Sequence, residues 1–593
     1  MEPIIHKIDD NMRSLEAFRE KLENHSSDKE KTVLLDYPIV YIHNWKSGEE
    51  YEIYIGESND VVRRTKQHYD KARDKGCWQY QLKKNSASLY IIGHEHFNKS
   101  LTLDIENRLM LYMMSVENVK KIHNKRSNRQ NRYYTDDELN EIFRFIWRNL
   151  RNTDSLLFPK ESVIKDSALF KASPLHKLTQ EQEDVKDRII EKVFHALKKN
   201  ERGQLIFIDG EAGTGKTVLN SSTFYELYSE AEEQGREDLQ CYLLVNHDEQ
   251  ITVYEQIAEK LGLNDRYGKV VCKPTTFINH HSADNPIDVA FVDEAHLLLT
   301  QGKQSYKGNN QLEDILNRAR VTVVMFDEYQ ILTTEQYWEA QILNHYRKIA
   351  KDNGNHFELR KQMRMAASEE TISWIDDFTK NKKVTKLPMD GTGYEIKVFD
   401  GPSELEAAIK KRAGEEEHEL SRMIATYDWE YSKNSSMEER MLAYWEVRIG
   451  DWHKPWNREL KKELGRKEKR RSKTLSWAEQ PQTINEVGST FTIQGFDLNY
   501  AGVILGPSVK YRDGEIVFDA SASFNAKATR NRTLSDGTKR KFGETLIQHE
   551  VRVLMTRGVN GLYLYACDDE LRRALKEAAG SQGKHETLLI KRK

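Results

Sequence analysis

The stretch QLIFIDGEAGTGKTVLNSSTFYEL, residues 204–227, joins an apolar run to a helical pattern through a glycine-rich loop. Glycines at Gly210, Gly213 and Gly215 expose backbone N–H groups that can surround phosphate, and the start of a helix adds a favourable dipole. Lys216 is expected to reach the terminal phosphates of ATP and Thr217 to bind Mg²⁺. A chance match on a structural turn is the weaker interpretation, because the flanking strand and helix both suit a P-loop.

Two further apolar runs downstream end in acidic residues. VAFVDEAH, residues 289–296, ends at Asp293 and Glu294, and VVMFDEYQ, residues 323–330, ends at Asp327 and Gln330. After a P-loop, Asp293 is expected to contact Mg²⁺ and Glu294 to orient the hydrolytic water. The stretch from Pro174 to the C-terminus alternates strands and helices, which predicts parallel α/β layers.

The composition is that of a large globular protein. The 593 residues are too many for one core and indicate roughly three or four domains. Hydrophobic residues make up 38% and charged residues 31%, with a formal net charge of −3, so any polyanion must meet a local basic patch. No apolar run approaches the ~20 residues of a membrane span, and the first residues lack a secretion pattern. Four widely spaced cysteines suit a reducing compartment, and we expect a cytoplasmic protein.

A second group of candidate site residues lies near the N-terminus. Alternation in IVYIHN, residues 39–44, and YEIYIG, residues 51–56, allows Tyr41 and Tyr54 to share one face of a hairpin. The following helix places Arg64 and His68 on one surface, since they are four residues apart. Taken singly, these side chains are packed strand aromatics or an exposed helix face. As an ordered set, they form a candidate site.

These N-terminal residues resemble the GIY-YIG nuclease domain over roughly residues 35–130. The resemblance implies that Tyr41 and Tyr54 position or deprotonate the attacking water and that Arg64 binds the scissile phosphate. It implies that Glu106, on the helix LTLDIENRLMLYMM, holds one Mg²⁺ or Mn²⁺ ion. His68 would assist proton transfer, since histidine titrates in a suitable range. The sequence departs from the family in its first glycine, which is isoleucine here, and Asn124 is matched to a late asparagine.

The remaining landmarks resemble superfamily 1 helicases and, more closely, the Schlafen-related helicase domain, over roughly residues 175–575. The resemblance implies that Gln182 reads adenine and that Gln330 senses the γ-phosphate. It implies that Arg364 and Arg557 are arginine fingers, because a phosphate held between two lobes needs positive charge from the far lobe. A fifth motif would contribute further nucleotide-binding residues. These are Gln494 and Gly495, with Thr492 and Asp497 beside them.

We therefore predict an α/β protein in which a small α+β GIY-YIG domain, with a three-stranded antiparallel sheet and helices, precedes two RecA-like parallel α/β lobes. The predicted segments run in the following order: 1–34, N-terminal helical segment; 35–130, nuclease domain; 131–174, connecting region; 175–365, first lobe; 366–593, second lobe with insertions. The nucleic-acid track is harder to locate. Candidates are His247, Thr276, Phe277, Trp429, Trp452, Trp456 and Trp477, although each tryptophan is more often a core residue.

The predicted function is an ATP-dependent DNA helicase or translocase with metal-dependent endonuclease activity, acting in bacterial defence against foreign DNA such as phage. Its cofactors are ATP and Mg²⁺, and its partner is single-stranded or duplex DNA in preference to RNA, without a membrane. A homo-oligomer or a defence-system protein partner is left open. The alternatives are an ATP-regulated DNA-binding switch with gated or absent cleavage, and a DNA repair nuclease-helicase.

Overall fold

A computed structural model describes residues 2–48, 50–72, 77–84, 86–124, 133–236, 238–302, 306–415, 418–431, 444–472, 475–493 and 496–589. The chain forms two compact units. The first comprises Met1–Glu183, Ser221–Gln240 and Thr252–Val271, and the second comprises Asp184–Asn220, Cys241–Ile251 and Cys272–Lys593. None of the helices within these described ranges is long and apolar enough to cross a membrane.

The first unit is built on a five-stranded mixed sheet. Its strand order is β1 (Ile4–Asp9), β4 (Ala87–Gly93), β2 (Ile39–Ser47), β3 (Glu50–Ser58) and β5 (Val119–Ile122). The three predicted antiparallel strands are β4, β2 and β3, but the predicted strand number is wrong because two short edge strands flank them. β1 pairs antiparallel with β4 and β5 pairs parallel with β3. The N-terminal segment, predicted to be helical, thus begins with a strand whose partner is about 80 residues away.

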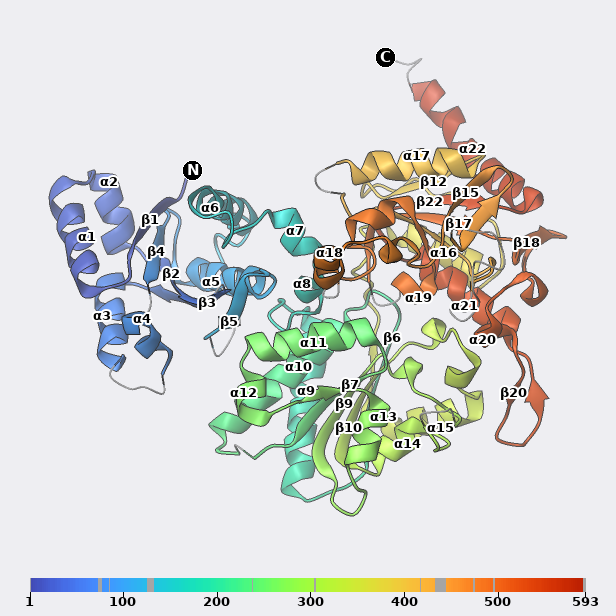
Figure 1. Cartoon of the computed structure of the whole chain (residues 1–593), viewed down its shortest axis with the longest axis horizontal. Coiled ribbons are helices and arrows are strands. Elements are labelled where there is room, and N and C mark those ends of the chain that lie inside the picture. The colour runs from blue at the N-terminus through green and yellow to red at the C-terminus, as the bar shows by residue number, and fades with distance from the viewer. Residues whose placement is uncertain are drawn as a thin grey trace. The chain divides into compact units, whose positions relative to one another are not determined.

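Helices cover both faces of this sheet (Figure 1). Strand alternation sends Val40 and Ile42 to one face, where α5 (Lys99–Met114) and α6 (Leu139–Thr153) pack. Ile39 and Tyr41 point to the other face, which α1 (Met12–His25) and α3 (Val61–Lys71) cover. Helix α6 lies in the stretch predicted as a connecting region, yet it shares the core of the sheet.

Shorter helices and three long ones complete this part of the chain. The short helices are α2 (Asp28–Lys31), α4 (Gln81–Lys84), α7 (Glu161–Asp166), α8 (Ala168–Ala172) and α12 (Leu263–Tyr267). The long helices, which have residues in both units, are α9 (Gln180–Lys198), α10 (Lys216–Glu233) and α11 (Asp248–Lys260).

The second unit contains two sheets, as expected for two RecA-like lobes. The sheet of the first lobe has the order β11 (His356–Leu359), β6 (Gln204–Gly210), β10 (Ala319–Phe326), β9 (Ile287–Asp293), β7 (Cys241–Val245) and β8 (Val271–Cys272). Its pairings from β11 to β7 are parallel. The strands are apolar on both faces because helices cover both sides of such sheets. Helices of this lobe include α13 (Pro274–His280), α14 (Gln311–Leu316) and α15 (Ala340–Asp352).

The sheet of the second lobe is also parallel. Its order is β12 (Glu395–Val398), β22 (Gly558–Ala566), β17 (Leu498–Leu505), β13 (Arg422–Ala425) and β16 (Val487–Gly488). Its helices are α16 (Glu369–Thr379), α17 (Pro402–Ala413), α18 (Arg466–Arg471), α19 (Thr490–Ile493), α20 (Ala526–Thr529), α21 (Gly543–Met555) and α22 (Asp569–Leu589). Three hairpins extend from it: β14 (Glu446–Ile449) with β15 (Trp452–Pro455), β18 (Val509–Arg512) with β19 (Glu515–Phe518), and β20 (Arg532–Thr533) with β21 (Lys539–Arg540).

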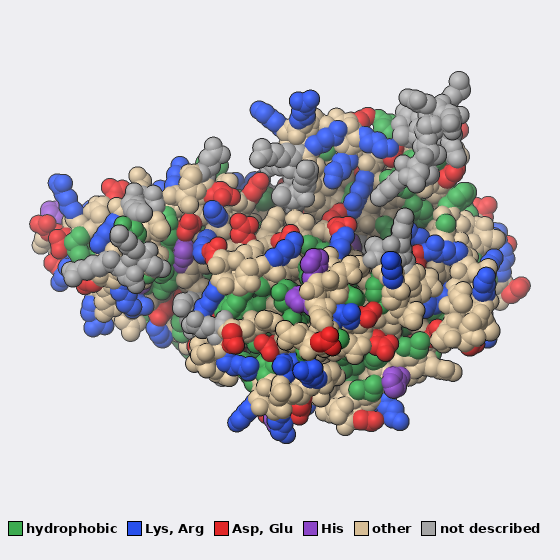
Figure 2. Space-filling model, turned by 60° about the horizontal axis from the view of Figure 1, so that its bottom comes forward, with side chains coloured by type: hydrophobic (Ala, Val, Ile, Leu, Met, Phe, Trp, Pro, Cys, Tyr) green, Lys and Arg blue, Asp and Glu red, His purple; other side chains and the backbone are tan. Residues whose placement is uncertain are grey.

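This topology decides where the polar side chains of the first lobe meet. Because β6, β9 and β10 are parallel neighbours, their carboxyl ends lie at one edge of the sheet. The P-loop, Asp293 and Asp327 follow those ends. On the face of the molecule that Figure 2 shows, basic and acidic side chains are interspersed, in keeping with the near-zero net charge.

Candidate functional site

The P-loop, residues 210–216, connects β6 to α10 by a tight turn. Gly213 has φ of 87° and Gly215 of 78°, a conformation that side chains other than glycine rarely adopt. A Cβ on Gly210 would lie 2.6 Å from a hydroxyl of the same loop, and one on Gly213 would lie 2.8 Å from the Cβ of Arg364. The backbone conformation therefore requires Gly213 and Gly215, and close packing favours glycine at Gly210.

Lys216, the first residue of α10, is held at the centre of this loop. Its Nζ donates to the carbonyl oxygens of Gly210 and Glu211, at 2.7 and 2.9 Å, and lies 3.3 Å from Asp327 Oδ2. Phosphate oxygens of ATP can replace these acceptors, since an ammonium binds phosphate as a point charge. Thr217 follows in the first turn of the helix, where its hydroxyl suits Mg²⁺.

The carboxylates at the end of β9 suit a nucleotide-bound cation. Asp293 is the last residue of the strand and is buried, and Glu294 follows with φ of 47°. Across the described ranges, no group of three or more His, Cys, Asp or Glu side chains is arranged to hold a metal ion. Mg²⁺ is commonly held by one or two protein oxygens together with substrate phosphates and water, so Thr217 and Asp293 fit a Mg²⁺–ATP complex.

A chain of hydrogen bonds runs from the P-loop lysine to the second lobe. Gln330 Nε2 donates to Asp327 Oδ2 at 2.8 Å, and Arg557 Nη2 donates to Gln330 Oε1 at 3.1 Å. Burial, with the nearby charge of Arg364, lowers the pKa of Arg557 to about 9. Arg364 itself pairs with Asp497, with Nε 2.5 Å from Oδ1. Both predicted arginine fingers therefore lie with the predicted γ-phosphate sensor.

The N-terminal candidate residues also come together. Antiparallel pairing places Tyr54 opposite His43 and Tyr41 opposite Gly56, so both phenols lie on one face of the hairpin. Tyr41 Oη lies 3.2 Å from His68 Nε2, and the Tyr54 ring centroid lies 5.3 Å from that of His68. The α3 helix, which starts after the Asp60 cap, brings the imidazole to the sheet.

Arg64 and Glu106 complete this cluster electrostatically. Burial raises the pKa of both Tyr41 and Tyr54, against the lowering influence of the Arg64 guanidinium on each phenol. Burial and the neighbouring Glu57 raise the pKa of Glu106 to about 8, although Arg64 opposes the shift. A cation that binds here would displace this proton into solvent and be held by the carboxylate, so Glu106 fits the single metal ligand that the resemblance implies.

Two contacts constrain strand β3 beside the N-terminal cluster. A Cβ on Gly56 would lie 2.5 Å from both Cζ and Oη of Tyr41, so only glycine leaves room for this phenol. Asn124 forms two hydrogen bonds with the backbone of Ile55, through Oδ1 at 3.0 Å and Nδ2 at 2.7 Å. This asparagine thereby fixes the strand that carries Tyr54.

The expected titration of His68 is wrong for the folded chain. Burial and the adjacent His43 lower the pKa of His68 to about 3, so the imidazole is neutral near pH 7. The sequence places His68 on a helix surface, but α3 turns that surface toward the sheet. His68 can accept or donate one hydrogen bond at Tyr41 Oη, without a charge of its own.

Residues 203–568 match the description Schlafen group 3, DNA/RNA helicase domain, which is more than half of the chain. The chain belongs to this Schlafen group 3 helicase family. An uncharacterized protein of Saccharomyces cerevisiae is 30% identical over 471 residues, covering 72% of this chain and 97% of the yeast protein. Membership of the family implies an ATP-hydrolysing helicase domain.

Solved helicase structures share only distant similarity with this Schlafen group 3 member. A Pif1 helicase from Candida albicans is 12% identical, with a TM-score of 0.20. The match covers 40% of this chain and 54% of the Pif1 chain. A DEAD box protein from Methanococcus jannaschii is 12% identical, with a TM-score of 0.25. The match covers 68% of this chain and 94% of the DEAD box chain. The chain thus spans about half the length of the Pif1 protein, and scores this low support no argument about function.

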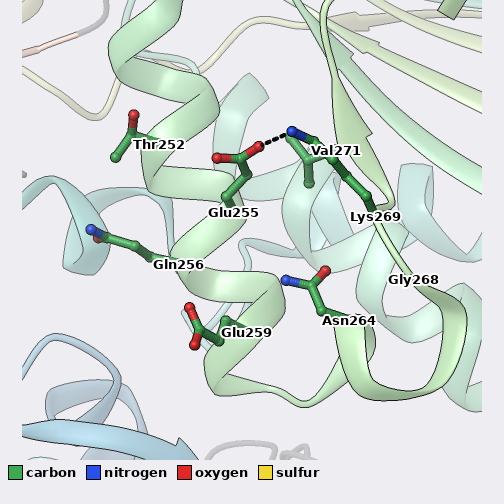
Figure 3. Close-up of a pocket in the computed structure, with 8 residues that line it drawn as sticks. All are labelled: Thr252, Glu255, Gln256, Glu259, Asn264, Gly268, Lys269 and Val271. Carbon is green, nitrogen blue, oxygen red and sulfur yellow. Dashed lines mark ion pairs between the residues drawn. The ribbon is translucent and has the colours of Figure 1, made fainter.

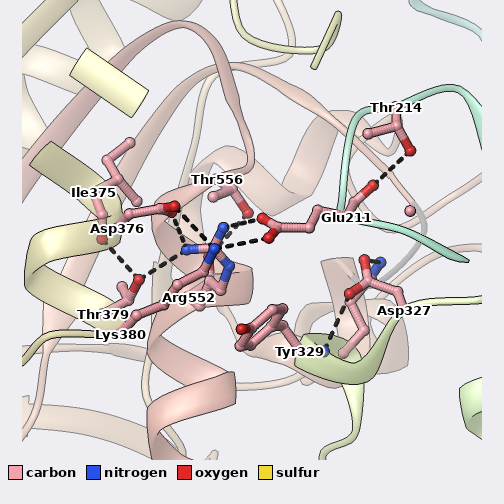
Figure 4. Close-up of polar contacts among 12 residues, drawn as sticks. Glu211, Thr214, Asp327, Tyr329, Ile375, Asp376, Thr379, Lys380, Arg552 and Thr556 are labelled. Carbon is pink, nitrogen blue, oxygen red and sulfur yellow. Dashed lines mark hydrogen bonds and ion pairs between the residues drawn. The ribbon is translucent and has the colours of Figure 1, made fainter. Parts of the chain in front are cut away.

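Sequence patterns did not reveal an ionic network that joins the P-loop to the second lobe of the Schlafen-type domain. Figure 4 shows Arg552 between Asp376 and Glu211, and it pairs with both. Lys380 Nζ lies 2.7 Å from Glu211 Oε1 and 2.9 Å from Asp376 Oδ2. Glu211 is an unspecified position of the P-loop pattern, so no local signal predicts its partners.

Buried residues behind the N-terminal cluster were also missed. His43 Nδ1 lies 2.5 Å from Asp10 Oδ2, and Tyr69 Oη donates to Asp10 Oδ1 at 2.7 Å. Trp78 stacks on Tyr54 with ring centroids 4.3 Å apart. Alternation in β2 puts His43 on the face of Tyr41, which is a signal that could have found it. Asp10 and Trp78 depend on long-range pairing.

Other predicted site residues stand as follows. The Gln182 side chain closes a capping box at the start of α9, accepting from Thr179 N at 2.9 Å, while Gln182 N contacts Thr179 Oγ1 at 3.3 Å. Its adenine-reading role stays a prediction. Gln494 and Gly495 lie outside the described residues. Of the nucleic-acid candidates, Phe277 is buried in the core of the first lobe.

The four tryptophan candidates are core residues or pack against the core. Trp456 and Trp477 are almost completely buried, and Trp429 and Trp452 pack against the core of the second lobe. A separate cavity of about 440 Å³ lies in the first unit, and its lining includes a Glu255–Lys269 ion pair (Figure 3). The two charged groups are 2.8 Å apart. None of the predicted site residues lines it.

Proposed function

We propose that the protein is an ATP-driven DNA helicase or translocase that carries a metal-dependent GIY-YIG-type endonuclease. Family membership supports the motor. DNA is favoured over RNA because of the superfamily resemblance, although the family description includes both nucleic acids. The hydrogen-bonded chain from Lys216 through Asp327 and Gln330 to Arg557 supports nucleotide-dependent movement of the lobes, since phosphate binding must rearrange it.

The nuclease assignment is carried by one observation: Tyr41 Oη lies 3.2 Å from His68 within a cluster that also includes Tyr54, Arg64 and Glu106. Arg64 would bind the scissile phosphate and Glu106 would hold Mg²⁺ or Mn²⁺. The bound cation supplies charge neutralisation at the phosphate. The phenols of Tyr41 and Tyr54 would orient the attacking water, and neutral His68 would hold the Tyr41 proton in place.

The cellular role that we propose is defence against foreign DNA, such as phage DNA. A nuclease tethered to a motor meets any strand that the motor engages at a raised effective concentration. The uncharged His68 and the isoleucine at position 39 favour one alternative, an ATP-regulated binding switch whose cleavage is gated or absent.

Nicking of supercoiled plasmid with Mg²⁺ tests the nuclease. The full chain should nick DNA, and Tyr54→Phe and Glu106→Ala should each reduce the rate by about a hundredfold or more, as expected for loss of a catalytic group. Tyr51→Phe is the matched control, because Tyr51 lies in the same strand but packs on the opposite face. Absence of metal-dependent cutting by wild type with or without ATP would favour the binding switch.

A further inference from the structure

Glu294, the residue expected to orient the hydrolytic water, is held by a neighbouring helix. Gln250 Nε2, in the first turn of α11, donates to Glu294 Oε1 at 3.3 Å. On the other side, His296 Nε2 lies 3.3 Å from Glu294 Oε2. Glu294 is only 6% exposed, and its φ of 47° is unfavourable for a residue with a side chain. One oxygen of this carboxylate is therefore engaged by Gln250.

The Gln250 side chain is buried although one of its polar atoms is unpaired in the described part of the chain. It is 6% exposed, and its Oε1 has no hydrogen-bond partner among the residues that the structure describes. A buried amide acceptor without a partner is unfavourable, so a glutamine retained only for packing is poorly suited to this position. Its described hydrogen bond is the one to Glu294.

The same turn of α11 is tied to the second lobe. Glu249, next to Gln250, forms an ion pair with Arg458, which lies between the β14–β15 hairpin and α18. Asn457 and Arg458 have φ of 58° and 72°, two consecutive strained residues. Asn457 is 5% exposed, and neither polar atom of its side chain has a partner in the described part of the chain. The buried polar atoms of Asn457 are therefore available to a further ligand at this contact.

The chemistry of the segment indicates what that ligand is. Arg458 is followed by a run with several exposed basic side chains, on a protein whose net charge is −3. These are Lys462, Arg466, Lys467 and Lys469. Glu459, Glu463 and Glu468 lie among them. Several exposed basic side chains in one segment suit a nucleic-acid backbone, and a phosphate can compete with Glu249 for the Arg458 guanidinium.

We propose that Gln250 is a positioning residue that restrains Glu294 until a single-stranded nucleic acid binds at Asn457 and Arg458. A phosphate that takes Arg458 from Glu249 releases the first turn of α11. Gln250 then leaves Glu294, whose carboxylate turns to the hydrolytic water. This inference rests on the proposed motor function, and it names the residues through which strand binding accelerates ATP hydrolysis.

The test compares ATP turnover with and without a single-stranded oligonucleotide in the full chain, with Glu106→Gln present throughout so that the strand stays intact. Gln250→Ala should raise the rate without the strand by about tenfold, because one hydrogen bond to a charged group is lost. The further acceleration by the strand should shrink correspondingly. Gln256→Ala, in the same helix but lining the cavity of Figure 3, is the matched control and should behave as the parent chain.

A second pair of variants tests the strand contact without touching Gln250. Glu249→Arg with Arg458→Glu keeps an ion pair of reversed polarity, so the rate without the strand should stay low while the acceleration is lost. Equal lowering of both rates by Gln250→Ala, or no change in either, would overturn the inference. Lys216→Ala separates the outcomes: if that variant still hydrolyses ATP, the motor assignment fails, and if it does not, the assignment stands whatever Gln250→Ala does.

Discussion

Lys216 links the phosphate-binding loop to the residues that contact the second lobe. Its ammonium donates to two carbonyl oxygens of the P-loop and faces the Asp327 carboxylate. ATP binding must exchange these acceptors for phosphate oxygens. Asp327 also accepts a hydrogen bond from Gln330, which in turn accepts one from Arg557. Moving Lys216 away therefore removes the positive charge beside Asp327 and alters this chain of hydrogen bonds.

Replacing this lysine should stop ATP turnover. We expect Lys216→Ala to reduce hydrolysis by about a thousandfold or more, because the residue contacts the phosphates that carry the developing charge. Phosphate release measured at saturating ATP checks the prediction. Lys348→Ala, at an exposed position of α15, is the control. Turnover that persists in Lys216→Ala would make the P-loop assignment wrong.

Glu106 makes the N-terminal unit sensitive to pH. Its pKa is raised to about 8, so the folded unit holds this proton more tightly than the unfolded chain does. The stabilisation from the neutral carboxyl is complete below about pH 4.5 and is lost as the pH rises through about 8. Glu106→Gln should remove this dependence and leave the metal-free unit about 1–3 kcal/mol more stable than wild type at pH 9.

Amide hydrogen exchange of α5 at pH 6 and pH 9 measures this difference, because exchange reports the local free energy of opening. Added Mg²⁺ should protect α5 of wild type at pH 9 and leave Glu106→Gln unchanged. The same dependence on pH in both proteins, after correction for intrinsic exchange, would contradict the raised pKa.

At the residue scale, the sequence predicts identities better than environments. Strand alternation placed Tyr41 and Tyr54 on one face, and the resemblance to the GIY-YIG domain added Arg64 and Glu106. The structure brings the four side chains together. The state of His68 was not predictable, because its pKa depends on burial against a sheet whose packing is not a local property. Asp10 was missed for the same reason.

At the scale of elements, the β2–β3 hairpin and α3 position the N-terminal cluster. Strand alternation and the helix after Asp60 were both predictable, since they depend on local periodicity and a capping residue. The pairing of the edge strands β1 and β5 was not predictable from local sequence, because their partner strands are distant along the chain. The hairpin nevertheless contains the most specific packing constraint, between Gly56 and Tyr41.

A methyl group at Gly56 should disturb the cluster directly. Gly56→Ala places a Cβ 2.5 Å from Cζ and Oη of Tyr41, so the phenol must move or the strands must separate. We expect a loss of about 1–3 kcal/mol in the stability of the N-terminal unit, as for other overpacked cores, and a loss of cleavage. Hydrogen exchange in β2 and plasmid nicking measure the two effects.

Gly391→Ala is the control for this change, since a Cβ there meets nothing within 4 Å. It should leave both measurements at wild-type values. If Gly56→Ala retained full stability and cleavage, Tyr41 would have to be free to move, and its close position beside His68 would not be needed for the reaction.

At the scale of the whole molecule, the two lobes of the second unit are connected through two sets of polar contacts. One is the Asp327–Gln330–Arg557 chain, and the other is the network of Glu211, Arg552 and Lys380. The fold class and the motifs of the first lobe followed from apolar runs ending in polar residues, and those of the second lobe from the helicase resemblance. The pairings across the lobes did not, because they join residues more than 150 positions apart.

Arg557 provides the test of this coupling. Its guanidinium is buried and donates to Gln330, to Phe496 O at 3.2 Å and, through Nε, to Val553 O at 3.1 Å. Arg557→Lys keeps a positive charge but cannot make these bonds together, so we expect hydrolysis to slow by about a hundredfold or more. Nucleotide binding should change by less than about threefold, because Lys216 and the P-loop are intact.

Binding of a fluorescent ATP analogue and single-turnover hydrolysis separate these effects, with Arg573→Lys at an exposed site of α22 as the control. If Arg557→Lys lost binding and hydrolysis to the same extent, the substitution would have damaged the fold of the second lobe. If it lost neither, charge from the far lobe would not be required. A selective loss of hydrolysis means that the positive charge of the second lobe acts on the hydrolysis step and not on ATP binding, which is a condition for a nucleotide cycle that drives movement along a strand.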